Sequence, residues 1–173
     1  MGCDKALLAW GGTDLLGHAV ARLRAVAGDV RILCGPGPRY GDRGLPLALD
    51  LVSGAGPLAG VLTGLAAVPG RAGLFLAVDL PHVPVALLAR LVARAEGWDA
   101  VVPVSPVGPE PLCAVYGPGC REPIRRRMAA GDFKMTGFWP EVRVLEVGPG
   151  ELREFGDPGK MFRNLNTPTD LTE

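Results

Sequence analysis

The chain has 173 residues, of which 48% are hydrophobic, and its 18 basic and 18 acidic side chains give a formal net charge of +0. This length fits one domain with a sizeable core, and the apolar content argues against intrinsic disorder. The balanced charge gives no reason to expect nucleic acid or a membrane surface as a partner. No apolar run approaches the ~20 residues that cross a bilayer, and no basic and then apolar leader opens the chain. We therefore expect a single soluble, cytoplasmic domain over residues 1–173.

The chain opens with Asp4-Lys5, the apolar run 6–10 and a Gly11-Gly12 turn. Apolar residues at helical spacing then predict a helix over about 14–27, and Gly28 is placed to end it. Further along, the pattern predicts strands at 30–34, 45–49, 74–78, 100–104, 112–116 and 142–147 and helices at 61–68, 85–95 and 122–130.

Strands that alternate with helices predict an α/β fold with a mostly parallel, doubly wound (Rossmann-like) sheet and helices on both faces. The last third of the chain breaks the alternation, which suggests one antiparallel strand within this sheet.

Cysteines and histidines are too scattered for a zinc site or a disulfide framework. They contain no C-x-x-C pair and stand at Cys3, Cys34, Cys113, Cys120, His18 and His82. Because Cys34 and Cys113 lie in apolar, strand-like runs, we expect them to be buried and unreactive.

Two carboxylates each follow a predicted strand. Asp79 comes directly after the unbroken apolar run 74–78, and Asp50 closes the strand at 45–49. In a parallel sheet both acids would emerge at the carboxyl ends of the strands, where open α/β sheets hold their ligands. Mg²⁺ prefers one or two carboxylates together with substrate phosphates and waters, so a magnesium site is one interpretation. A turn or cap role for each Asp is the alternative.

A glycine-rich segment precedes the predicted helix at 61–68. Its backbone N–H groups and the helix N-terminus offer a seat for an anion, or else the segment is a plain tight turn; it comprises Gly56, Pro57, Leu58, Ala59 and Gly60. It is not a Walker loop, since no Gly-Lys-Ser/Thr follows. Lys5 would add a point charge for phosphate, although a single Lys near the N-terminus is usually a solvated surface residue.

The carboxyl-terminal tail carries two amides, Asn164 and Asn166, on either side of Leu165. In an extended segment both amides would point the same way. Such a pair suits hydrogen bonding to a polar heterocycle, but it also suits an ordinary turn.

Five short motifs occur in an order that resembles the molybdenum cofactor guanylyltransferases of the nucleotidyltransferase superfamily. They are Met1-Gly2-Cys3-Asp4-Lys5, GPLAG at 56–60, Asp79-Leu80-Pro81, Pro109-Glu110-Pro111-Leu112 and Asn164-Leu165-Asn166-Thr167-Pro168. The resemblance covers essentially the whole chain. It implies that a terminal phosphate of molybdopterin attacks the α-phosphorus of GTP, which yields the guanine dinucleotide form of the cofactor and pyrophosphate.

The same resemblance implies a role for each motif. Asp79 would hold Mg²⁺ and Lys5 would neutralise triphosphate charge, so both are expected to be catalytic and to bind the nucleotide. Asp50 and the GPLAG segment would line the guanine nucleotide site, while Asn164 and Asn166 would lie on the pterin side. Cofactor-delivery proteins and acceptor molybdoenzymes would be further partners.

The chain departs from the family pattern in two places. The family's first strand and its Leu-Ala-Gly-Gly loop come before the Met-Gly-x-Asp-Lys segment, so we expect Met1 to be an internal Met of a longer reading frame. Loss of that central strand would expose two neighbouring strand edges. In addition, Cys34-Gly35-Pro36 stands where the family tends to carry Asn.

Two alternatives to guanylyl transfer stay open at the level of sequence. One is a related nucleotidyltransferase that uses CTP or a sugar-1-phosphate. The other is a non-catalytic carrier of the pterin cofactor.

Overall fold

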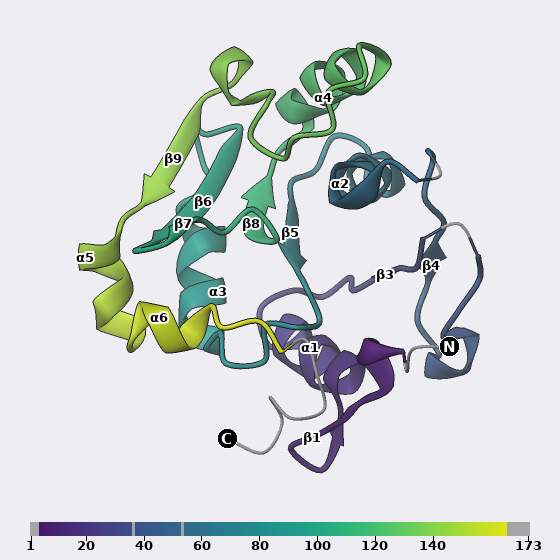
Figure 1. The fold of residues 1–173 in the computed structure, drawn as a ribbon, viewed down its shortest axis with the longest axis vertical. Coiled ribbons are helices and arrows are strands. Elements are labelled where there is room, and N and C mark those ends of the chain that lie inside the picture. The colour runs from purple at the N-terminus through teal and green to yellow at the C-terminus, as the bar shows by residue number, and fades with distance from the viewer. Residues whose placement is uncertain (1–3, 36, 53, 166–173) are drawn as a thin grey trace.

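A five-stranded sheet forms the centre of the molecule (Figure 1). The computed structural model describes residues 4–35, 37–52 and 54–165. The strands are β5 (Gly73–Leu76), β6 (Ala100–Ser105), β7 (Gly108–Pro109), β8 (Cys113–Tyr116) and β9 (Val144–Val147). Their order is β5-β8-β6-β7, and β9 also pairs with β6. Because β8 is antiparallel to both β5 and β6, these two strands run the same way, and β9 is parallel to β6.

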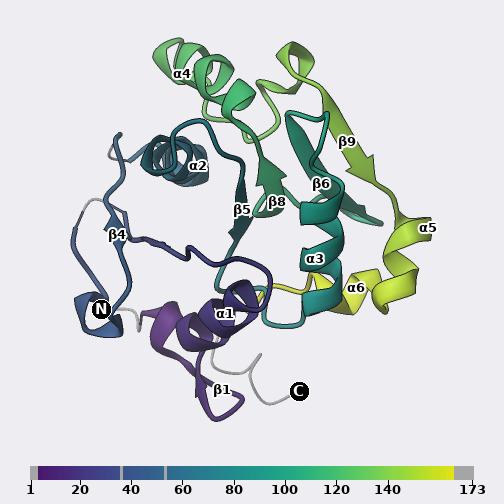
Figure 2. The same ribbon diagram turned by 180° about the vertical axis from the view of Figure 1, so that it is seen from behind.

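Helices cover both faces of this sheet (Figures 1 and 2). One apolar core joins Phe75 and Tyr116 to α2 (Gly56–Ala67) and α4 (Arg121–Ala129). The other joins Leu74 and Leu76 to the opposite set of helices, which are α3 (Val85–Ala93), α5 (Pro149–Leu152) and α6 (Pro158–Met161). The sheet therefore has the two covered faces that its unbroken apolar strands predict.

The amino-terminal third forms a separate unit with its own small core. Strands β3 (Ile32–Leu33) and β4 (Leu47–Ala48) pair in parallel, and α1 (Leu15–Arg24) packs against them through Leu16. Before α1 lies a hairpin of β1 (Ala9–Trp10) and β2 (Thr13–Asp14). Its turn is Gly11-Gly12, and both glycines have positive φ, as a two-residue hairpin turn requires.

Short 3-10 turns make up the remaining regular structure of the described residues. They are η1 (Lys5–Leu7), η2 (Gly41–Arg43), η3 (Pro118–Cys120), η4 (Trp139–Glu141) and η5 (Arg153–Phe155).

The structure confirms the predicted α/β architecture with helices on both faces. The expected antiparallel strand is β8, and β7 adds a two-residue hairpin to β6. Cys34, Cys113 and Cys120 are free and buried, and burial raises the pKa of the Cys113 thiol to about 12. Within the described residues, no helix is long and apolar enough to span a bilayer.

Candidate active site

The candidate site lies where β4 and β5 end. An ion pair joins Arg71, ahead of β5, to Asp29, ahead of β3, at 3.9 Å. At the other end, Val78 after β5 packs on the core that contains Cys34 after β3. The two strands therefore run in the same direction, and β4 is parallel to β3. Asp50 and Asp79 both emerge at this side of the sheet, which we call the carboxyl edge.

Asp79 stands at the carboxyl edge with its side chain available to a ligand. The residue is partly exposed, and within the described residues no hydrogen bond or ion pair engages its carboxylate. Its backbone carbonyl accepts a hydrogen bond from Leu165 N at 3.0 Å. This bond brings the exposed Asn164 beside the predicted catalytic carboxylate, whereas Asn166 lies outside the described residues.

The loop that follows Asp79 is fixed by two side chains of α1. The buried Arg22 guanidinium donates to the carbonyls of Leu80, Pro81 and Val83 at 2.6–2.9 Å. His18 Nε2 also lies 3.1 Å from the Pro81 carbonyl. No pattern in the sequence signals this clamp, since an Arg one position beside an apolar stripe usually faces solvent.

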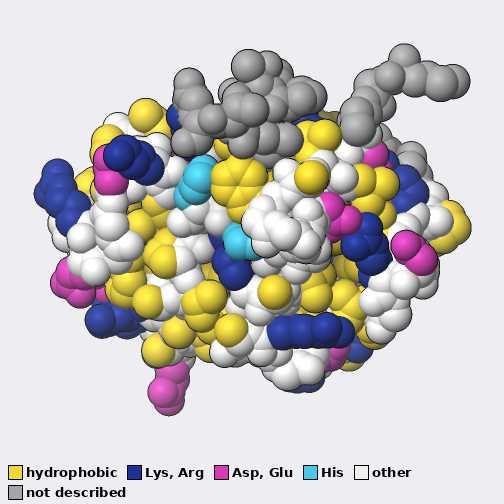
Figure 3. Space-filling model, turned by 90° about the horizontal axis from the view of Figure 1, so that it is seen from below, with side chains coloured by type: hydrophobic (Ala, Val, Ile, Leu, Met, Phe, Trp, Pro, Cys, Tyr) yellow, Lys and Arg dark blue, Asp and Glu magenta, His cyan; other side chains and the backbone are white. Residues whose placement is uncertain are grey.

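Both histidines of the chain lie beside Trp10, and their side chains are the two cyan patches in Figure 3. The Trp10 ring centroid lies 5.2 Å from that of His82 and 6.4 Å from that of His18. Burial, together with nearby Arg163, Arg22 and His18, lowers the pKa of His82, so its imidazole is neutral at pH 7.

The GPLAG segment is the first part of α2, not a loop ahead of it as the sequence had suggested. The helix begins at Gly56, and its N-cap residue Ala55 makes no side-chain capping bond. The first-turn N–H groups, including that of Leu58, therefore remain available to an anion. The N–H of Gly60, in the second turn, is instead part of the hydrogen-bonded helix. The Leu58 side chain is fully buried, so only its backbone faces outward.

Lys5 belongs to a turn that is anchored at the carboxyl end of β3. Asp4 caps this turn by accepting from Ala6 N at 3.1 Å. The Asp4 carboxylate also accepts from Tyr40 Oη at 2.7 Å and pairs with Arg39 at 3.5 Å. Since Tyr40 follows β3, these bonds hold the exposed Lys5 near the carboxyl edge.

A second acid, Glu110, is half-buried just ahead of β8. Glu110 N donates to Pro103 O of β6 at 2.8 Å, and Glu110 O accepts from Cys113 N at 3.0 Å, so this acid lies in the turn between β7 and β8. Burial raises the pKa of Glu110, and a hydrogen bond with Ser105 partly offsets that shift. Glu110 entered the sequence analysis only as part of a motif, because an acid between two prolines carries no chemical signature of its own.

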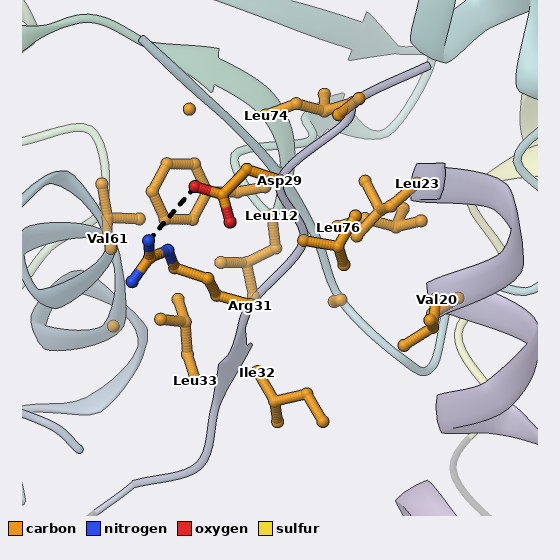
Figure 4. Close-up of a pocket in the computed structure, with 18 of the residues that line it drawn as sticks. Val20, Leu23, Asp29, Arg31, Ile32, Leu33, Val61, Leu74, Leu76 and Leu112 are labelled. Carbon is orange, nitrogen blue, oxygen red and sulfur yellow. Dashed lines mark hydrogen bonds and ion pairs between the residues drawn. The ribbon is translucent and has the colours of Figure 1, made fainter. Parts of the chain in front are cut away.

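A cavity of about 730 Å³ lies between β3 and β5 (Figure 4). Three predicted site residues, Pro57, Gly60 and Asp79, line it, but most of its wall is aliphatic. Lys5, Asp50 and Asn164 lie outside its lining. Asp50 is half-buried, and desolvation raises the pKa of its carboxyl.

Comparison with known proteins decides the family. A family model for the MobA-like NTP transferase domain matches residues 1–140. The chain belongs to this family. The transferase is 34% identical, over 100% of its length and 84% of the relative, to a probable molybdenum cofactor guanylyltransferase of Pelotomaculum thermopropionicum. It is 36% identical to another from Chloroflexus aggregans, over 98% of the chain and 85% of the relative.

Solved structures show the same fold. Molybdopterin-guanine dinucleotide biosynthesis protein A from Archaeoglobus fulgidus superposes on the transferase with a TM-score of 0.82 at 24% identity, over 99% of this chain and 88% of that one. The 2-C-methyl-D-erythritol 4-phosphate cytidylyltransferase from Thermus thermophilus superposes with a TM-score of 0.71 at 24% identity, over 97% and 90% of the two chains. The resemblance inferred from the motifs is thus confirmed: the transferase is a nucleotidyltransferase of the molybdenum cofactor guanylyltransferase family.

The residues at the carboxyl edge of the transferase fit a divalent cation held mainly by substrate. Within the described residues, no group of three or more His, Cys, Asp or Glu could hold a metal ion. In that same part of the chain, Asp79 offers an unpartnered carboxylate shortly after an apolar strand. One carboxylate together with phosphate oxygens and waters is the usual coordination of Mg²⁺ at nucleotide sites.

Proposed function

We propose that the transferase moves GMP from GTP to the molybdopterin form of the molybdenum cofactor and releases pyrophosphate. The observation that carries this proposal is the match of essentially the whole chain to relatives named molybdenum cofactor guanylyltransferases. The structure supports it with Asp79, which is partly exposed at the carboxyl edge of the sheet and lies beside Asn164. The carboxylate of Asp79 has no partner among the described residues.

In the proposed reaction, a terminal phosphate oxygen of molybdopterin forms a bond to the α-phosphorus of GTP. The bond from that phosphorus to the bridging oxygen of the β-phosphate breaks, and pyrophosphate leaves with the electron pair. Such transfers need positioning and charge stabilisation far more than a protein nucleophile. A bound Mg²⁺ would neutralise the phosphate charge and orient the α- and β-phosphates.

Side chains of this chain would do the positioning. Asp79 would hold the cation, and Lys5 would contribute a positive charge to the triphosphate. The N-terminus of α2 would meet phosphate or ribose oxygens through N–H groups of its first turn. Asp50 would face the guanine nucleotide, while Asn164 and Asn166 would bind the pterin.

The first test replaces the proposed metal ligand. We expect Asp79→Asn to lower pyrophosphate release from GTP, Mg²⁺ and molybdopterin by about a hundredfold or more, because the charge that holds the cation is lost. Asp42→Asn is the matched control, since Asp42 is exposed and lies in η2. Activity of Asp79→Asn within twofold of the wild type, with an unchanged circular dichroism spectrum, would remove Asp79 from the mechanism.

The second test separates the two substrates. Asn164→Ala should raise the KM for molybdopterin and leave the KM for GTP unchanged. The reason is that Asn164 belongs to the carboxyl-terminal segment, which bonds to Asp79 through Leu165 and is proposed to bind the pterin. An equal rise for both substrates would contradict a pterin role. Running the same assay with GTP, CTP and ATP tests base selectivity, and a preference for CTP would replace guanylyl by cytidylyl transfer.

A further inference from the structure

Guanine and pterin present the same hydrogen-bonding edge. Each contains a 2-amino-4-oxopyrimidine ring, in which a ring N–H stands beside the amino group. A carboxylate only accepts hydrogen bonds, so its two oxygens can take both donors of this edge at once. An enzyme that joins GTP to molybdopterin can therefore use one such acceptor on each side of the reacting phosphates.

Two acids at the carboxyl edge are half-buried and form no ion pair within the described residues. They are Asp50, after β4, and Glu110, in the turn between β7 and β8. Because β6 runs the same way as β5, its end and this turn stand at the same edge as Asp79. Burial raises the pKa of both carboxyls. A partly desolvated acid gains from nearby donors, so ligand N–H groups would stabilise either carboxylate.

Along this edge, Asp79 lies between the two acids. On one side of β5 are β3 and β4, across the cavity, and on the other are β8 and then β6 (Figure 1). Glu110 is bonded to Pro103 of β6. Since strands are spaced ~4.8 Å apart, the turn that holds Glu110 stands about 10 Å to the side of β5. A substrate whose phosphate meets a cation at Asp79 could extend its ring system to this turn.

Glu110 borders the same core as the carboxyl-terminal segment. Cys113 packs in the core that contains Met161 and Phe162, just before Asn164. Burial raises the pKa of the Cys113 thiol to about 12, and Arg22 opposes this shift while the charge of Glu110 adds to it. The Glu110 carboxylate therefore lies near that core, on the side where Asn164 is proposed to bind the pterin.

The turn holds Glu110 in place and leaves its carboxylate only partly bonded. Ser105, at the end of β6, is 3% exposed and forms a hydrogen bond with Glu110. The same hydroxyl lies 3.1 Å from Gly108 O, so its single hydrogen serves two acceptors. Prolines on either side of Glu110, Pro109 and Pro111, fix φ at their own positions. Most of the roughly four lone-pair sites of the carboxylate thus remain for a ligand.

Building on the proposed function, we infer that Glu110 recognises the pterin ring of molybdopterin. Its carboxylate accepts hydrogen bonds from the ring N–H and from the 2-amino group, as Asp50 would from guanine on the other side of Asp79. Glu110 then determines which ring system is accepted on the pterin side, while Asp79 serves the phosphates between the two rings.

Two ligands that differ at one position test this recognition without turnover. In 6-hydroxymethyllumazine a carbonyl oxygen replaces the 2-amino group of 6-hydroxymethylpterin. A carboxylate accepts from the amino group and repels the carbonyl oxygen. We therefore expect equilibrium dialysis to show that the wild type binds the pterin at least about tenfold more tightly. Glu110→Gln offers an amide donor to the carbonyl, so the two Kd values should come within about threefold of each other.

Three further variants are the controls. Glu96→Gln changes an exposed acid at the opposite edge and should keep the wild-type ratio of Kd values. Glu110→Asp keeps a carboxylate in the turn and should keep a preference for the pterin. Asp50→Asn should leave this ratio unchanged and raise the KM for GTP. An unchanged circular dichroism spectrum would show that each variant is folded.

The transfer assay supplies a second measurement. Glu110→Gln should raise the KM for molybdopterin about tenfold or more and leave the KM for GTP unchanged. A wild-type ratio of Kd values near one, an unchanged ratio in Glu110→Gln, or an equal rise in both KM values would overturn the inference. Pterin selectivity that depends on Glu110, in a protein that releases no pyrophosphate, would uphold the inference and contradict the proposed guanylyl transfer.

Discussion

At the scale of single residues, the position of Asp79 depends on a side chain from another part of the chain. Arg22 is only 7% exposed and donates to three carbonyls in the loop that follows Asp79. Burial lowers the pKa of its guanidinium, which nevertheless stays charged at neutral pH, as arginine does in proteins. Arg22 thus orients the loop that begins at the proposed metal ligand.

We expect Arg22→Met to lower the free energy of unfolding by about 3 kcal/mol or more, since three buried carbonyls lose their donor. If the variant folds, its kcat should fall and its apparent affinity for Mg²⁺ should weaken, while the KM for GTP changes little. Urea denaturation and magnesium titrations of pyrophosphate release would measure these effects. Arg24→Met on the exposed side of the same helix is the control, and equal behaviour of the two variants would refute the positioning role.

At the scale of elements, one acid joins the start of α1 to η2. Asp14 caps α1 by accepting from Gly17 N at 2.7 Å, and it forms an ion pair with Arg43. Burial alone would raise the pKa of Asp14, but the Gly17 and Arg43 bonds outweigh it and hold the pKa below its usual value. Because its pKa is lower in the folded protein, the Asp14 carboxylate contributes to the free energy of unfolding above the unfolded-state pKa of about 3.9. This contribution is lost as the pH falls through the folded-state pKa.

Asp14→Ala should therefore destabilise the protein by about 1–2 kcal/mol at pH 7, the usual cost of a lost N-cap. At pH 3 the difference from the wild type should shrink, because the wild-type carboxylate becomes protonated. Denaturant unfolding at both pH values would measure this. Asp42→Ala is the control: it removes an acid near Arg43 that is 79% exposed, so it should change the free energy of unfolding little. A loss of stability in Asp14→Ala that is the same at both pH values would contradict the interpretation.

Local periodicity predicted most elements but not their ends or their pairing. The helices at α1 and α3 follow from apolar spacing, and β5, β6 and β8 from unbroken apolar runs. The β1–β2 hairpin was missed because its strands are only two residues long and one of them ends in the cap of α1. The start of α2 was placed too late because glycine and proline usually mark loops, although proline is favoured in a helix's first turn.

The candidate site was predictable to a similar extent. A carboxylate after an apolar strand is visible in sequence, so Asp50 and Asp79 could be placed at one edge of the sheet. Arg22 and Glu110 could not, because their positions depend on contacts between residues distant along the chain. Those contacts arise only when α1 packs on the loop after β5 and when the turn before β8 bonds to β6.

At the scale of the whole molecule, the described chain consists of two units that meet across the cavity. The larger unit has the five-stranded sheet with a core on each face, and the smaller contains α1, β3 and β4. Ties between them include the Arg22 clamp, the contact of Val78 with the smaller core and the exposed Arg71–Asp29 pair. Element pairs across this boundary make fewer contacts than the strands of the five-stranded sheet make with one another, which favours separate opening of the two parts.

Tryptophan fluorescence can follow the two units separately in the 173-residue chain. Trp10 lies in the hairpin of the smaller unit, and Trp139 packs on the core of the larger one. Variants that keep only Trp10 or only Trp139, with Phe at the other two Trp positions, should unfold in urea with midpoints that differ by ~0.5 M or more, Trp10 first. Coincident transitions would show that the two units unfold together as one cooperative unit.

Both ends of the described chain lie at the carboxyl edge: Asp4 is bonded to Tyr40, and Leu165 to the peptide of Asp79. A label attached directly at Asp4 or at Leu165 would thus stand beside the face where nucleotide and pterin are proposed to meet. The connection between α3 and β6, where Glu96 and Gly97 are exposed at the opposite edge, is a better insertion point for such a label. Weak activity of a form labelled at the carboxyl edge should therefore be compared with that of a form labelled between α3 and β6 before it is assigned to the enzyme itself.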